Sequence, residues 1–151
     1  MRSLLFVCLA LLIVCLVSQA ATLRIRPDGT GDYPTIQAAI DACHDGDDIL
    51  LADGRYQGTG NRNINTEGKS ITVWSGSNDP KACVIDCGGL DRAFMIMDGE
   101  GPSTVVRGIG LLNGTATSGS GGLVYIHDSS PTFIKCIFAN GSADDGGAIH
   151  T

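Results

Sequence analysis

Two adjacent carboxylates near the end of the sequence are the first residues whose types suggest chemistry. Asp144 and Asp145 precede His150 by a short stretch, and hydrolysis of a glycosidic bond uses a pair of carboxyl groups. Aspartate is also common in turns, and no flanking catalytic motif accompanies this pair. We therefore interpret Asp144 and Asp145 as turn residues and predict no catalytic residue in this segment.

A second group of chemically suitable residues consists of Asp86, Asp91 and Arg92. Carboxylates can bind Ca²⁺, but Ca²⁺ takes roughly six or more oxygen ligands. These three residues are candidates by type only, and we interpret them as turn carboxylates and a surface arginine. The sequence therefore predicts no metal site and no cofactor site.

Two histidines occupy matching places in the sequence. His127 and His150 each follow an isoleucine and come shortly after a Gly-Gly pair. If the intervening residues form one turn of a repeat, the two imidazoles lie one above the other on neighbouring turns. Such a pair could hold a metal ion, but a ladder of like residues is the simpler interpretation, and we predict the ladder.

Four cysteines follow the N-terminal apolar segment: Cys43, Cys83, Cys87 and Cys136. Cys83 and Cys87 could pair across a turn, because secretion permits disulfides, although spacing alone does not fix the connectivity. Buried free thiols are the alternative. A zinc site is disfavoured, because there is no second cysteine pair at ligand spacing and the histidines are scattered.

The elements that would position these residues repeat along the chain. The pairs Gly121-Gly122 and Gly146-Gly147 each stand shortly before an Ile-His pair, and the second continues as Ala148-Ile149. Two Asn-Gly pairs, which begin at Asn113 and Asn140, recur at a similar interval. A period of roughly 20 to 50 residues is typical of stacked structural units. We expect these residues to be a repeat motif of a solenoid.

Short segments rich in Ile, Val, Phe and Thr predict strands separated by Gly, Asn, Asp and Ser turns. The predicted strands are residues 70–74, 83–86, 93–97, 104–112, 123–127, 131–138 and 148 onward. We expect two alternating families, one near Ile71, Phe94, Val124 and Ala148, the other near Val84, Val105 and Thr132. This pattern predicts an all-β, right-handed parallel β-helix of about four coils. An antiparallel sandwich is the alternative, but it would not explain the recurrence.

The N-terminal segment 1–20 is typical of a secretory signal peptide. One arginine precedes an apolar run from Leu4 to Val17, Ser18-Gln19-Ala20 supplies small residues, and cleavage is expected between Ala20 and Ala21. The run is shorter than the ~20 residues that span a bilayer, so no transmembrane helix is expected in the mature chain. A lipid anchor on Cys15 is the alternative.

Residues 21–60 predict an N-terminal cap of strand, helix and strand. The first strand is expected at 22–26 and the second at 48–52. Between them Ile36, Ala39, Ile40 and Cys43 form one apolar helical stripe. The short helix is expected to cover the open end of the stack. Residues 61–151 would then be β-helix coils, incomplete at the C-terminal end.

The charge of the chain excludes some partners. The sequence has 10 basic and 16 acidic residues, for a net charge of −6. A nucleic-acid-binding domain has a basic face, so we expect no nucleic-acid partner. The 21 glycines lack the every-third spacing of collagen and fit many tight turns between short strands.

Several motifs resemble those of known β-helix proteins. The segment 28–41, with Gly46-Asp47-Asp48-Ile49 and Gly54-Arg55-Tyr56, resembles the opening of pectin-lyase-like right-handed parallel β-helix proteins. Segments 85–89, 92–94, 130–132 and 136–138, with Gly146-Gly147-Ala148-Ile149, resemble secreted bacterial β-helix repeat proteins and polymorphic outer-membrane protein repeats. The resemblance implies this fold and secretion.

Two functions agree with the resemblance. The first is an extracellular or cell-surface stalk, without catalysis in this segment, that adheres to or binds polysaccharide or a host or cell-surface glycan on its long flank. The alternative is a polysaccharide-degrading enzyme of the pectate lyase or polygalacturonase kind, with active residues beyond Thr151. Only the lyase alternative would involve Ca²⁺.

Overall fold

The chain folds as a parallel β-solenoid of about five turns with one short helix near the N-terminus. The computed structural model describes residues 19–117 and 119–151, so most of the predicted signal peptide, with Cys15, lies outside the described residues. Sheet A has the order β1-β2-β4-β7-β10, sheet B β11-β8-β5-β3 and sheet C β12-β9-β6. The elements are β1 (Thr22–Ile25), α1 (Ile36–Ala42), β2 (Asp48–Leu51), β3 (Gly54–Tyr56), β4 (Thr72–Ser75), β5 (Cys83–Asp86), β6 (Phe94–Ile96), β7 (Val105–Arg107), β8 (Gly110–Leu112), β9 (Val124–Ile126), β10 (Thr132–Ile134), β11 (Ile137–Ala139) and β12 (Ile149–His150).

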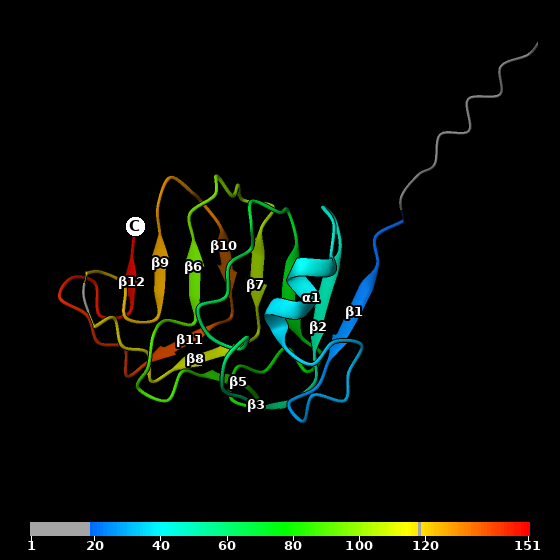
Figure 1. The fold of residues 1–151 in the computed structure, drawn as a ribbon, viewed down its shortest axis with the longest axis horizontal. Helices are drawn as coiled ribbons and strands as arrows, with labels where there is room; N and C mark the ends of the chain where they lie inside the picture. Colours follow the sequence, from blue (N-terminus) through cyan, green and yellow to red (C-terminus); the bar gives the residue numbers. More distant parts are fainter. Residues whose placement is uncertain (1–18, 118) are drawn as a thin grey trace, which may run out of the picture.

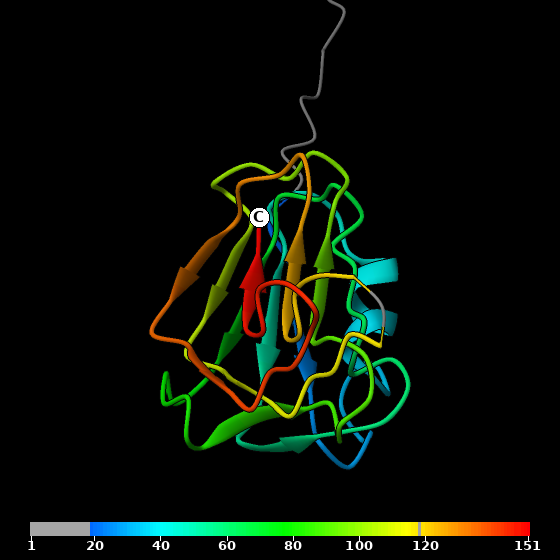
Figure 2. The ribbon, with the colours of Figure 1, turned by 90° about the vertical axis from the view of Figure 1, so that its left-hand side faces the viewer.

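The strands of successive turns lie side by side along the length of the molecule (Figure 1). A view along the stack shows the three sheets enclosing a common interior (Figure 2). One residue of each turn points inward in register: Leu23, Ile49, Val73, Val106 and Phe133 in sheet A. Tyr56, Ile85, Leu111 and Phe138 form the matching row of sheet B. These rows form the core, and burial of each large side chain stabilises the fold by about 1.5–3 kcal/mol.

The prediction of a parallel solenoid with a short helix is confirmed, but the two expected strand families are wrong. Ile71 immediately precedes β4 of sheet A, where β7 and β10 also lie, whereas Val84 belongs to sheet B. Phe94 and Val124 do share a sheet, as expected. Sheets A and B are separate families that the sequence prediction had merged, and about five turns are present instead of four.

Two segments predicted as single strands are each divided by a short corner. Residues 104–112 contain β7 and β8, and residues 131–138 contain β10 and most of β11. At the corners Gly108 and Lys135 have φ values of +68° and +51°. A single residue in the left-handed conformation turns the chain from sheet A to sheet B. The corner therefore needs no loop that the sequence would reveal. A further strand, β3, follows the strand, helix and strand that were predicted for residues 21–60.

The helix α1 begins where the sequence places it. Thr35 is the N-cap and accepts a hydrogen bond from the Ala38 N–H at 3.2 Å. Ile36, Ala39 and Ile40 are buried, so the predicted apolar stripe faces the core. The helix lies in the first turn between β1 and β2 (Figure 1). No helix in the described residues is long and apolar enough to cross a membrane.

The glycine repeat occupies equivalent places on neighbouring turns. The Gly122 N–H donates to the Gly146 carbonyl at 3.1 Å, and the Gly121 N–H donates to the Asp145 carbonyl at 2.9 Å. The Leu123 N–H donates to Ala148, and β12 then pairs Ile149 with Val124. A Cβ on Gly122 would lie 2.2 Å from the Gly147 carbonyl oxygen. Close approach of two backbones therefore explains why glycine is needed here.

Cys43, Cys83, Cys87 and Cys136 are free thiols in the structure. Cys83 and Cys87 are both buried, one in β5 and the other directly after it. Four residues of extended chain span roughly 13 Å, whereas a disulfide needs Cα atoms about 4.4–6.8 Å apart. The suggested pairing of Cys83 with Cys87 is therefore incompatible with this strand, and the free-thiol alternative describes the structure.

Candidate functional site

The residues first considered for chemistry do not form one site. Asp144 and Asp145 are exposed, and Asp145 takes part in a parallel bridge with Ser120 between two turns. His150 lies in β12, beyond the turn that holds the two carboxylates. The pair is a turn between strands, as interpreted from the sequence.

Asp86 is a buried carboxylate that is fully occupied by neighbouring side chains. Asn113 Nδ2 donates to Asp86 Oδ1 at 2.8 Å and Gln57 Nε2 donates to Oδ2 at 2.9 Å, while the Arg55 guanidinium forms an ion pair with Oδ2. Burial raises the pKa of Asp86, but hydrogen bonds from Asn113, Gly88 and Arg55 outweigh it and lower the pKa on balance. Asp86 therefore ties three turns together.

Asp91 and Arg92 point to different partners. Asp91 pairs with Arg62 at 3.6 Å. Arg92 donates twice to the Ser120 carbonyl, at 3.0 and 2.8 Å, and its guanidinium carbon lies 5.5 Å from the Tyr125 ring centroid. No group of three or more His, Cys, Asp or Glu residues in the part of the chain that the structure describes is arranged to hold a metal ion.

The predicted stacking of His127 on His150 is wrong. The register of β9 and β12 places His150 beside Tyr125, and the two rings are 5.7 Å apart with an interplanar angle of 4°. The Gly-Gly pairs set the register, and they are separated by a longer stretch of chain than the histidines are. The spacing of the histidines was therefore misleading. The outer face of sheet C thus carries an aromatic ladder whose rings face one another.

The outer face of sheet A carries a continuous row of basic, apolar and aromatic side chains. One residue comes from each strand, in the order Arg24, Leu50, Trp74, Arg107 and Ile134. The Arg107 guanidinium carbon lies 5.0 Å from the Trp74 ring centroid, within cation–π range. Because strand residues alternate between faces and the neighbours of this row build the core, the row faces outward.

A recess of about 190 Å³ lies beside the N-terminal half of this row. It is lined by Arg24, Ile25, Arg26, Leu50, Leu51, Ala52 and Gly76. A Cβ added at Gly76 would lie 3.5 Å from Leu50 Cδ1, so the recess exists because the residues at 52 and 76 are small. Two exposed arginines therefore flank a hollow whose floor is apolar.

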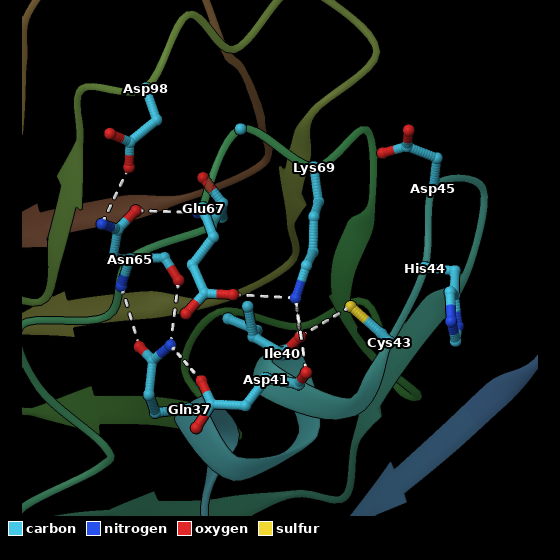
Figure 3. Close-up of polar contacts among 12 residues, drawn as sticks. Gln37, Ile40, Asp41, Cys43, His44, Asp45, Asn65, Glu67, Lys69 and Asp98 are labelled. Carbon is cyan, nitrogen blue, oxygen red and sulfur yellow. Dashed lines mark hydrogen bonds and ion pairs between the residues drawn. The ribbon is translucent and has the colours of Figure 1, made fainter.

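A second hollow, of about 470 Å³, lies at the end of α1 and is lined by Cys43, His44, Asp45 and Lys69. Figure 3 shows that Lys69 points to the end of the helix. Its Nζ donates to the Ile40 carbonyl at 2.6 Å and contacts Glu67 at 2.8 Å. Burial raises the pKa of the Cys43 thiol. Lys69 therefore stabilises the helix end, and its amine is engaged by the Ile40 carbonyl and Glu67.

Comparison of the chain with protein-family models, curated proteins and solved structures finds no match. The fold therefore rests on the structure itself, and the candidate site rests on its geometry. None of Arg24, Leu50, Trp74 and Arg107 was predicted from the sequence as a site residue. The signal that could have found them is the alternation within Leu23-Arg24-Ile25 and Val73-Trp74-Ser75, where the outward residue is charged or aromatic.

Proposed function

We propose that this protein is an exported, extracellular or cell-surface β-solenoid that binds polysaccharide or a cell-surface glycan, without catalysis in this segment. The observation that carries the proposal is the recess beside Arg24, Leu50 and Trp74 on the outer face of sheet A. The motif resemblance to secreted bacterial β-helix repeat proteins, polymorphic outer-membrane repeats included, supports export and surface location. The binding requires no cofactor.

The chemistry of this face suits a sugar chain. Sugar rings have apolar faces that pack on Leu50 and on the Trp74 indole, and burial of this apolar surface is favourable. Each arginine offers five N–H donors in a fixed fork, which can bind sugar hydroxyls or the carboxylate of an acidic sugar. A solenoid repeats these contacts along an extended surface, so several weak contacts add up along one chain.

A pair of glycine variants tests the recess directly. Gly76 does not have a left-handed backbone conformation, and its neighbours lie at ordinary contact distance from an added Cβ, so Gly76→Phe can place its ring in the recess without backbone strain. Gly101 is equally unrestricted, with nothing within 4 Å, and Gly101→Phe is the matched control. We expect Gly76→Phe to weaken binding to immobilised polysaccharides at least tenfold, while Gly101→Phe changes it little.

Aromatic variants locate the binding face. Trp74→Ala removes the ring of sheet A, and Tyr125→Ala removes the ring of the sheet C ladder. Binding to acidic and neutral polysaccharides should fall for Trp74→Ala and persist for Tyr125→Ala. Equal losses in both variants, or binding that survives Gly76→Phe, would contradict the assignment to sheet A.

The same preparation separates binding from catalysis. Acidic polysaccharides are incubated with the purified protein, with and without Ca²⁺, and their chain length is followed. Unchanged chain length together with binding supports the proposal. Shortened chains would overturn its non-catalytic part and favour the enzyme of the pectate lyase or polygalacturonase kind.

A further inference from the structure

The first residue after the expected cleavage site is held by a buried carboxylate. The Ala21 N–H donates to Asp47 Oδ1 at 2.7 Å, and the Ala21 carbonyl accepts from the Asp48 N–H at 2.8 Å. Asp47 is only 7% exposed, whereas Gln19 and Ala20 are exposed. Ala21 is therefore placed by two hydrogen bonds directly at the boundary of the fold.

We propose that Asp47 is the binding site for the new amino terminus that processing creates at Ala21. A peptidase hydrolyses the Ala20–Ala21 peptide bond with water, whose oxygen enters the Ala20 carboxylate. The Ala21 nitrogen gains both protons of that water and becomes an ammonium. A neutral amide donor beside Asp47 is thus replaced by a cation, and the hydrogen bond becomes an ion pair.

The surroundings of Asp47 suit a cation. Its second oxygen, Oδ2, accepts from the His44 N–H at 2.8 Å, which leaves Oδ1 to the Ala21 nitrogen. These two hydrogen bonds, Ala21 first, lower the pKa of Asp47 and keep it ionised at neutral pH. The His44 ring lies 3.9 Å from Oδ2 and is 87% exposed. The 2.7 Å distance from the Ala21 nitrogen already lies in the range of charge-assisted bonds, about 2.7–2.9 Å.

The geometry requires no rearrangement after cleavage. Thr22 pairs with Asp48 in the register of β1 and β2, so the chain that follows Ala21 stays fixed. The inference rests on export and processing, which belong to the proposed function, and is independent of glycan binding. A chain that is processed at this position forms the ion pair between its own amino terminus and Asp47. A chain with extra residues before Ala21 lacks this ion pair.

The test compares proteins that differ at the terminus. The full precursor is expressed with export, and mass spectrometry of the purified protein determines its first residue. A second precursor carries one serine inserted between Ala20 and Ala21, so that its processed terminus is displaced by one position. Asp47→Asn is made in both, and Asp45→Asn, an exposed carboxylate of the same turn that accepts from the Ser70 N–H, is the control.

We expect the purified protein to begin at Ala21. We also expect Asp47→Asn to change the unfolding equilibrium constant about tenfold more in the protein with the native terminus than in the protein with the displaced terminus. Tenfold corresponds to about 1.4 kcal/mol. Asp45→Asn should have the same effect in both. Equal effects of Asp47→Asn in both backgrounds would overturn the ion pair, and a terminus at another residue would overturn the site. Polysaccharide binding, measured on the same samples, reports separately on the proposed function.

Discussion

Glu100 shows how a single buried carboxylate joins loops from three successive turns. It is 2% exposed, and its two oxygens accept from Thr66 Oγ1 at 2.6 Å, Gly68 N at 3.0 Å, Asp98 N at 2.8 Å and Ser129 Oγ at 2.9 Å. Each carboxylate oxygen accepts one hydrogen bond from a backbone N–H. The loops between sheets C and A are therefore fixed by this side chain.

Replacement of Glu100 by glutamine should destabilise the protein. The amide NH₂ group must face one of the two backbone N–H donors, which loses its acceptor inside the protein at a cost of about 1–3 kcal/mol. Urea unfolding followed by the fluorescence of Trp74, the single tryptophan, measures the change. Glu67→Gln, which removes an exposed partner of Lys69, is the control and should cost below about 1 kcal/mol. Equal midpoints for wild type and Glu100→Gln would contradict the role of Glu100.

The thiols should differ in reactivity according to burial. Burial raises the pKa of Cys83 and of Cys87 to about 12, and the thiolate is the reactive form. Cys136 is only partly buried. We expect a thiol reagent at pH 8 to label Cys136 first and Cys83 and Cys87 only in denaturant, with mass spectrometry locating the label. A Cys83–Cys87 crosslink in the native exported protein would show that the strand geometry differs from the one described.

At the scale of elements, α1 depends on capping because it has only seven residues. The Thr35 hydroxyl accepts from the Ala38 N–H, and Asn61 Oδ1 accepts from the Ile36 N–H at 3.0 Å. Thr35→Ala should lower the free energy of unfolding by about 1 kcal/mol. Thr59→Ala, at an exposed position, is the control in the same urea titration. A loss no larger than that of the control would mean that Asn61 alone caps the helix.

The corners between sheets A and B offer a matched pair of substitutions. Gly108 and Lys135 occupy equivalent places, since the Gly108 N–H donates to the Ile134 carbonyl, and both have positive φ. Gly108→Ala should be destabilising by at least about 1–2 kcal/mol, because the new Cβ also meets Asn78 Cα at 2.8 Å. Lys135→Gly relieves the left-handed strain and should be neutral or stabilising. Thermal unfolding of both variants measures the difference, and a stable Gly108→Ala would contradict the geometry of the corner.

At the scale of the molecule, the repeat predicts the solenoid but not the neighbours across it. Gly-Gly pairs and short apolar segments are local signals, and they predict stacked parallel strands. The row from Arg24 to Ile134 is aligned in space although its members are unevenly spaced along the chain, because the loops vary in length. A fixed period therefore misplaces residues, as it did for His127 and His150. The recess also needs small residues from two different turns, at positions 52 and 76, which no local pattern connects.

Acid sensitivity is a property of the whole stack, because carboxylates join its turns. The pKa values of Asp47, Asp86 and Glu100 are lowered in the folded protein. A carboxylate whose pKa is lowered by folding stabilises the folded protein. This stabilisation is complete above the pKa of the unfolded state, about 3.9 for Asp and 4.3 for Glu, and is lost as the pH falls through the pKa of the folded state. The urea midpoint should therefore be nearly constant from pH 7 to about pH 5 and fall steeply below about pH 4.

The variants separate the contributions to this acid sensitivity. Glu100→Gln and Asp86→Asn each remove one titrating link, so each should flatten the fall between pH 5 and pH 3 while lowering the midpoint at pH 7. Asp45→Asn removes an exposed carboxylate that accepts one backbone hydrogen bond, from Ser70, and should leave the slope closer to that of the wild type. A slope that is the same in all four proteins would mean that acid acts through net charge and not through these links.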